Sequence, residues 1–323
     1  MELAAGYTRW IAVGAAFIIF GHTISNVIRA EGSAKESMIG NLIGTVVNIV
    51  LDPAMILGMD MGVAGAAIAT VIGNLCAFVY YLWYFKHKKT TVLSISIRDF
   101  AMGGKIASSV FAIGTPGALG NLLMSFSMIF MNLLLVGYGD NAIAAMGVCM
   151  KVAMIVVMLQ MGLAQGVLPI LSYNYGAKNH DRLMETIKKA GIVCVGLGSV
   201  LTVICFAACH SIVAAFVTGA EVIDLGVLMT KAVLLSGPVI GIYYLCISVM
   251  QALGKVIQPI VISLMRQGIV YIPMMYVLNM LFKLNGLIYT QAVSDYLAII
   301  ISIVFCFMAL SKLTIKPKKR DLF

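Results

Sequence analysis

A carboxylate, an amide and a proline stand together inside an otherwise apolar stretch, NIVLDPAMILG at residues 48–58. Asn48 and Asp52 are four residues apart, so a helix would place both side chains on one face. Their oxygens could hold a hard cation such as Na⁺, which takes oxygen ligands. A carboxylate that leaves water also holds a proton more readily, so H⁺ is the second candidate. The alternative is that Asp52 and Pro53 only mark a kink or a helix end, because proline removes a backbone hydrogen bond.

The composition indicates the surroundings of these residues. The chain is 61% apolar and 11% charged, whereas a soluble protein carries about a quarter charged residues. Its apolar runs are long enough to cross a bilayer, and inside lipid such runs must be helices. We therefore predict an all-α polytopic membrane protein with nine transmembrane helices, at 8–28, 38–58, 61–85, 107–138, 141–172, 187–209, 223–250, 257–280 and 285–310.

The depth of Asp52 follows from the second span. Lys35 and Glu36 fix one end of this span, and about 16 residues of helix from there to Asp52 cover roughly 24 Å. That is too short to cross the membrane, so the helix continues to about Gly58. A carboxylate at that depth costs about 2.5–3.5 kcal/mol and normally faces the protein interior or a watery cavity.

The basic residues indicate the orientation. They gather in alternate loops, whereas the opposite loops hold only Arg9 and Lys283. The positive-inside rule then places the C-terminus in the cytoplasm and, with nine spans, Met1 outside. The net charge of +9 is therefore no sign of nucleic-acid binding.

An internal repeat relates the first three spans to the last three. RAEG at 29–32 matches QALG at 251–254, LDP at 51–53 matches YIP at 271–273, and 64–74 lies over 285–295, with offsets of 222, 220 and 221. Parallel repeats of this kind are typical of secondary transporters. They predict two six-helix lobes, of which the first is half present and lacks three helices, roughly 110 residues. We assign 1–85 to the first lobe, 86–106 to a cytoplasmic linker, 107–310 to the second lobe and 311–323 to a basic cytoplasmic tail.

Several stretches resemble the MATE (multidrug and toxic-compound extrusion) transporters. In chain order they are IRAEGSAKESM (28–38), NIVLDPAMILGMDMGVAGAAIAT (48–70), GTPGAL (114–119), YGDNAIAAMGV (138–148), GLAQGVLPILSYNYGAKN (162–179), QALGK (251–255) and RQGIVYIP (266–273). They extend over the whole chain in the order of the family, from the fourth helix to the twelfth.

The resemblance implies an antiporter that exports amphipathic, often cationic compounds against an inward flow of Na⁺ or H⁺. It places the coupling site on Asn48, Asp52 and Thr70, with a further carboxylate on a first helix that has no counterpart in this sequence. The runs 117–132 and 234–250, where some relatives carry acidic residues, contain none. The family also implies a monomer without a cofactor, in the bacterial cytoplasmic (inner) membrane.

Further candidates come from charges and polar residues within the spans. Arg266 and Asp295 lie mid-span in neighbouring helices, so we predict that they pair, as a structural ion pair or as a gate. Flexible methionine side chains suit a cavity that accepts many shapes, although at helical spacing they often only pack. The candidate cavity residues are Asn121, Met124, Ser125, Met128 and Lys151.

Two other functions remain as alternatives to multidrug export. A flippase for lipid-linked oligosaccharides would need several cationic residues for a pyrophosphate, and only Lys151, Lys231 and Arg266 are available. An inactive, truncated remnant of a MATE transporter is the second alternative. An enzyme is not expected, because no paired-carboxylate or HExxH pattern occurs. We also expect no bound metal beyond Na⁺ at Asp52.

Overall fold

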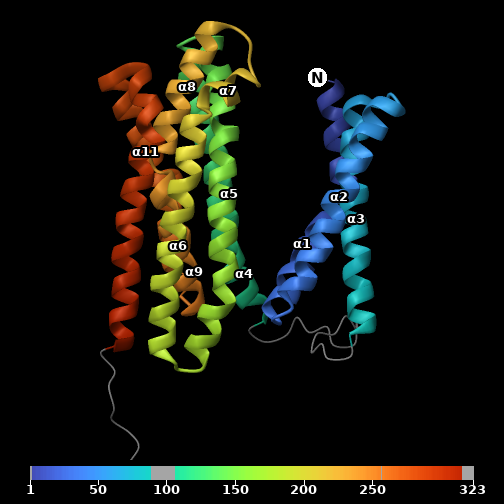
Figure 1. The fold of residues 1–323 in the computed structure, drawn as a ribbon, viewed down its shortest axis with the longest axis vertical. Coiled ribbons are helices and arrows are strands. Elements are labelled where there is room, and N and C mark those ends of the chain that lie inside the picture. The colour runs from blue at the N-terminus through green and yellow to red at the C-terminus, as the bar shows by residue number, and fades with distance from the viewer. Residues whose placement is uncertain (1, 89–105, 256, 315–323) are drawn as a thin grey trace, which may run out of the picture. The chain divides into compact units, whose positions relative to one another are not determined.

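The computed structural model describes residues 2–88, 106–255 and 257–314, and nearly all of them are helical (Figure 1). No strand occurs among these residues. The expected all-α polytopic membrane fold is thereby confirmed. The chain divides into two compact units, residues 1–102 and 103–323. The predicted linker at 86–106 and the tail at 311–323 fall largely outside the described residues.

Three long helices make up the described part of the first unit. α1 spans Glu2–Ala30, and α2 spans Ala34–Pro53 and continues as a π-helix, η1, at Ala54–Gly58. α3 spans Gly62–His87 and packs against both α1 and α2. The crossing of α2 and α3 is close because it is made by glycines: a Cβ atom on Gly73 would lie 2.5 Å from the carbonyl oxygen of Gly44. Small residues at a helix crossing are typical of packing in membranes.

A polar network ties the three helices together near the turn from α1 to α2. Gly32 makes this turn with a φ of 92°. The hydroxyls of Ser25 on α1 and Ser37 on α2 are 2.8 Å apart, and Tyr81 of α3 donates to the backbone carbonyl of Ser37 at 2.9 Å. Ser25, Ser37 and Tyr81 are all buried. Because these bonds fix α2 at its first turn, they also fix the depth of Asp52 near its end.

The second unit contains the remaining helices. They are α4 (Ile106–Val136), α5 (Asp140–Gly176), α6 (His180–Ala207), α7 (Cys209–Ala214), α8 (Ala220–Leu234), α9 (Gly237–Ala252), α10 (Ile257–Leu264), the π-helix η3 (Met265–Ile269) and α11 (Tyr271–Thr314).

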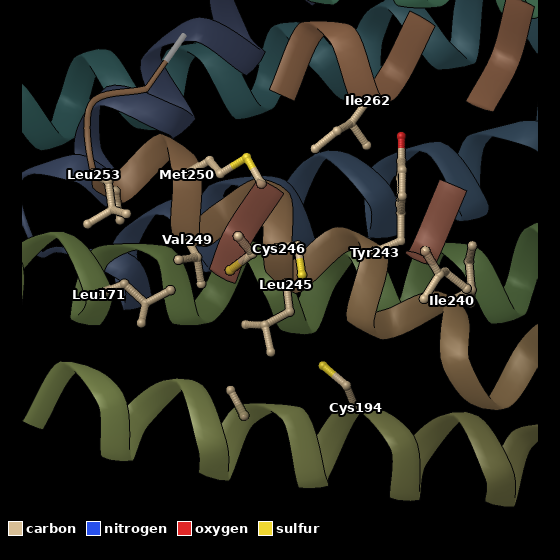
Figure 2. Packing of buried hydrophobic residues seen from close by; sticks show 14 of the residues in the cluster. Leu171, Cys194, Ile240, Tyr243, Leu245, Cys246, Val249, Met250, Leu253 and Ile262 are labelled. Carbon is tan, nitrogen blue, oxygen red and sulfur yellow. The ribbon is translucent and has the colours of Figure 1, made fainter. Parts of the chain in front are cut away.

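A cluster of buried apolar side chains holds α9 against its neighbours (Figure 2). Leu171 of α5 and Cys194 of α6 contribute to it, as does Ile262 of α10. Figure 2 shows Tyr243 extending from α9 toward the segment that carries Ile262, and its hydroxyl lies 3.5 Å from Oγ of Ser263. This packing sets the position of η3, which directly follows α10.

α11 is not one straight helix. Lys283, within it, has φ 53° and ψ −135°, far from helical values. A straight helix would separate Arg266 and Asp295 by roughly 44 Å, yet their side chains meet at 2.7 Å. The chain therefore reverses at Lys283, and a Cβ atom on Gly286 would overlap the backbone of Leu278. Glycine is needed at this position so that the two arms can approach.

Length and composition identify seven described helices that can cross a membrane, or eight if the bent pair of α8 and α9 is one span. The prediction was nine. The difference lies in Ile257–Ser311, which counts as one 55-residue span although the chain reverses inside it at Lys283. When its two arms are counted separately, each predicted span has a helical counterpart in the described residues.

Helices α8 and α9 form one interrupted span. They meet at an angle of 44°, between Leu234 and Gly237. Pro238 lies in the first turn of α9, where its missing N–H is tolerated, but it cannot continue a helix that comes from α8. The backbone groups freed at this break need other partners, and the carbonyl of Leu235 accepts from the Tyr296 hydroxyl at 2.9 Å.

The glycine crossing of the first unit can be tested with one matched pair of substitutions. Gly73→Ala should lower the thermal unfolding midpoint of the purified protein, because its Cβ would meet the Gly44 carbonyl and overpacking costs about 1–3 kcal/mol. Gly21→Ala in α1 should leave the midpoint unchanged or raise it, since the nearest atom is 3.9 Å away and alanine restricts the unfolded chain. Equal shifts in the two variants would contradict a close crossing at Gly73.

Candidate functional site

The first unit brings together the three residues that the family resemblance singled out. Nδ2 of Asn48 lies 3.3 Å from Oδ1 of Asp52 and 3.3 Å from Oγ1 of Thr70. Asn48 and Asp52 come from α2 and Thr70 from α3. All three side chains are half-buried. Thr70 also donates to the carbonyl of Ala66 at 2.9 Å, so its hydroxyl oxygen remains an acceptor for Asn48.

Asp52 lies at an interruption of its helix. α2 ends at Pro53 and the chain continues as the π-helix η1. Pro53 has no N–H to donate to the carbonyl of Ile49, and a π-turn leaves the regular α ladder, often at a functional site. The two interpretations of Asp52-Pro53, a site and a structural interruption, therefore describe the same place.

The cluster offers oxygen ligands on two helices. They are the carboxylate of Asp52, the amide oxygen of Asn48 and the hydroxyl of Thr70. In the described arrangement the amide nitrogen of Asn48, not its oxygen, faces Asp52 and Thr70. A bound Na⁺ would require this amide to turn over, whereas a proton on Asp52 would not, because a protonated carboxyl can still accept from Asn48.

The second unit contains a buried ion pair. Nε of Arg266 lies 2.7 Å from Oδ1 of Asp295, and the two residues are 5% and 3% exposed. Oδ1 of Asp295 also accepts from Gln291 at 2.9 Å, and Oδ2 accepts from Ser236 at 2.7 Å. Tyr244 accepts from Nη1 of Arg266 at 3.3 Å. A buried pair with this many hydrogen bonds recovers much of the cost of leaving water.

Two interrupted helices meet at this pair. Arg266 lies within η3, and Ser236 lies at the break between α8 and α9. Irregular backbone at membrane depth is tolerated where protein or a cavity surrounds it. Ser236, Tyr244 and Gln291 were not singled out from the sequence. The stretch SGP at 236–238 could have identified Ser236, because a proline inside an apolar span indicates a helix break.

A cavity of about 350 Å³ adjoins the ion pair. Its walls come from α4, α5, α8, α9, η3 and α11, all within the second unit. Apolar side chains make most of the wall, and the polar residues among them include Arg266 and Asp295. The full lining is Met124, Ser127, Met128, Met131, Met150, Ala153, Met154, Val156, Val157, Val233, Leu234, Ser236, Gly237, Ile240, Tyr244, Arg266, Gln267, Tyr271, Gln291 and Asp295.

The five candidate cavity residues divide between the cavity and other places. Met124 and Met128 line it, whereas Asn121, Ser125 and Lys151 are not part of its lining. Ser125 bonds back to the carbonyl of Asn121 at 3.1 Å, and Nζ of Lys151 lies 5.4 Å from the centre of the Phe216 ring. Asn121 lies about one helical turn before Met124. Ser125 and Lys151 each directly follow a lining methionine, so their side chains point about 100° away from it around the helix axis.

The helical architecture, with seven or eight described helices that can cross a membrane, is that of a multi-pass membrane protein. Residues 1–54 and 116–277 match the MatE family model, so the chain belongs to the MATE family. This family is one of transporters, not of enzymes.

Among its relatives is the multidrug export protein MepA of Staphylococcus aureus strain MSSA476. The two are 31% identical over 316 residues, which is 98% of this chain and 69% of MepA. MepA of Staphylococcus saprophyticus is 29% identical over 315 residues, with the same coverage.

Solved structures agree in fold. An outward-facing multidrug resistance MATE transporter matches with a TM-score of 0.89 at 22% identity, over 98% of this chain and 71% of the other. A transporter of the MOP superfamily from Pyrococcus furiosus Vc1 (DSM3638) has the same TM-score and identity, over 97% of this chain and 71% of its own.

The buried ion pair is expected to behave differently from an exposed one. Asp295→Asn would leave Arg266 buried without its counter-charge and should destabilise the protein by about 3–5 kcal/mol. The double variant Arg266→Gln/Asp295→Asn should recover most of this loss, because no uncompensated charge remains. The measurement is the thermal unfolding midpoint of the purified protein.

The control is the pair Lys189–Glu185, which is also 2.7 Å long but has side chains 74% and 59% exposed. Glu185→Gln should change stability by less than about 1 kcal/mol. If Asp295→Asn alone were as stable as the unaltered protein, the pair would not be charged and buried as described.

Proposed function

We propose that the chain acts as an ion-coupled antiporter that exports small amphipathic, often cationic compounds. The observation that carries this proposal is the cluster of Asn48, Asp52 and Thr70, a carboxylate with two polar partners across two membrane helices. The multidrug export named for the MepA relatives supports the choice of substrates. The place of the protein would be the bacterial cytoplasmic membrane, as a monomer.

Coupling needs a group whose affinity for the driving ion changes as the transporter changes conformation. Asp52 can serve because it is half-buried beside a helix interruption, where a small backbone change alters how much water reaches the carboxylate. Na⁺ would be held by the oxygens of Asp52, Asn48 and Thr70. H⁺ would be held by Asp52 alone, with Asn48 donating to either form.

A flippase for lipid-linked oligosaccharides is the weaker candidate. It would need several cationic side chains facing a pyrophosphate, and Arg266 alone is cationic among the residues that line the cavity. Lys151 lies over the Phe216 ring and outside the lining of the cavity.

The coupling role predicts a loss of transport on removal of one charge. Asp52→Asn should abolish efflux of ethidium from membrane vesicles under an imposed Na⁺ gradient and under an imposed pH gradient, because an amide neither exchanges a proton nor balances a cation. The gradient that drives efflux by the unaltered protein would identify the coupling ion.

Asp60→Asn is the matched control. Asp60 is an exposed carboxylate eight residues further along, with a φ of 52° that asparagine adopts readily, so efflux should persist. Gradient-driven efflux that survives in Asp52→Asn would remove the coupling role from this residue.

The distribution of basic residues predicts the orientation, with the C-terminus in the cytoplasm. Green fluorescent protein fused after Phe323 should fluoresce, and alkaline phosphatase fused there should be inactive. Alkaline phosphatase fused after Gly139, in the turn between α4 and α5, should be active because this turn lies on the opposite side. Phosphatase activity at Phe323 would reverse the orientation.

A further inference from the structure

The cavity of the second unit has a wall suited to varied apolar bodies. Five methionines line it, and three of them, Met124, Met128 and Met131, follow one face of α4. Thioether side chains are flexible and polarizable, so they adapt to irregular shapes. A volume of about 350 Å³ lies within the range of small-molecule pockets.

Within the ion pair of the wall, the carboxylate is well occupied, whereas the guanidinium keeps free donors. The carboxylate of Asp295 accepts three hydrogen bonds, from Arg266, Gln291 and Ser236. The guanidinium of Arg266 has five N–H groups. Among the described residues, it donates through Nε to Asp295 and through Nη1 to Tyr244, and it also hydrogen-bonds the Tyr243 hydroxyl, which leaves two N–H groups. Because Arg266 is 5% exposed and lines the cavity, a ligand there can take these bonds.

The position of Arg266 is fixed from several sides. Its guanidinium lies 4.8 Å from the Tyr243 ring centre and 5.8 Å from that of Tyr244. Ser294 donates to its backbone carbonyl at 3.1 Å. A cationic ligand would have to displace this guanidinium from Asp295 and leave it buried without a counter-charge, which is unfavourable. An anionic group would leave the ion pair intact and would share the guanidinium with Asp295.

The start of α9 adds to the preference for negative charge. Gly237, the first residue of this 16-residue helix, lines the cavity together with Ser236. The N-terminal end of a helix carries a partial positive charge and favours anions. Arg266 and the start of α9 therefore act in the same sense on a ligand in the cavity.

We propose that this cavity binds amphipathic carboxylates, with the apolar body against the methionines of α4 and α5 and the carboxylate on the free N–H groups of Arg266. Asp295 holds Arg266 in place and keeps the empty cavity neutral. Zwitterions whose cationic group stays at the cavity mouth belong to the same class. The inference concerns the second unit alone and does not depend on ion coupling at Asp52.

The test uses the full 323-residue protein in lipid nanodiscs, without an ion gradient. Binding is measured by isothermal titration calorimetry, and the heat recorded with empty nanodiscs is subtracted. The probe is dansylglycine, an aromatic carboxylate. Its neutral amide and the cationic dansylethylenediamine are the matched compounds. We expect saturable binding of dansylglycine, and binding weaker by about tenfold or more for the other two, because both lose the charge-assisted bonds to Arg266.

Two variants probe the two parts of the site. Arg266→Gln/Asp295→Asn removes the anchor without leaving a buried charge, and Met128→Trp fills the apolar part. Both variants should bind dansylglycine with an affinity lower by about tenfold or more. Met158→Trp is the control, since Met158 lies on α5 but outside the lining of the cavity. This variant should bind dansylglycine as tightly as the unaltered protein does.

Equal or tighter binding of the cationic compound would overturn the proposal, as would unchanged affinity in either cavity variant. If the double variant does not fold, the comparison of the three probes and the Met128→Trp variant still decide. Asp52→Asn should bind dansylglycine normally, so a failure of ion coupling and a failure of this site are distinguishable.

Discussion

A polar group inside this chain is most stable where the protein itself supplies its partner, because a bilayer core contains no water to supply one. This constraint accounts for the features that matter most. The polar network of Ser25, Ser37 and Tyr81 satisfies itself across three helices. The ion pair of Arg266 and Asp295 collects bonds from three further side chains, those of Ser236, Tyr244 and Gln291. Each such group specifies how its helices are rotated and how deep they lie.

The same constraint explains why the interrupted helices coincide with the polar clusters. A break in a membrane helix frees backbone groups, which are stable only beside protein or a cavity. η1 begins two residues after Asp52, and the break between α8 and α9 lies at Ser236, which binds Asp295. Breaks and polar side chains thus stabilise one another.

The internal repeat places different chemistry on similar scaffolds. With the offset of 221 residues, Thr70 corresponds to Gln291 and Asn74 to Asp295. In the first unit the helices cross through Gly44 and Gly73, in direct backbone contact. In the second unit the corresponding residues are Met265 and Ser294, and the Ser294 hydroxyl donates to the backbone carbonyl of Arg266 at 3.1 Å. The first crossing is direct backbone contact, whereas Arg266 and Asp295 beside the second crossing line a cavity.

Much of the architecture could be predicted from the sequence, because apolar length and the bilayer thickness alone define the spans. The grouping of Asn48 with Asp52 followed from helical periodicity, and the pairing of Arg266 with Asp295 from their depth. The cavity residues were harder. Met128 lines the cavity while Ser125, on the same helix, does not, because the rotation of α4 depends on neighbours distant in sequence. Ser236 and Tyr244 likewise acquire their roles only when α9 packs against η3.

The π-helix after Pro53 has a geometric consequence for Asp52. A π-turn contains one residue more than an α-turn. If the extra residue of η1 moved to the other side of Asp52, that side chain would rotate by about 100° around the helix axis. The carboxylate would then leave Thr70 and face a different surface, with neither end of α2 displaced. Such a rotary register shift would let one helix present its charge alternately to two environments.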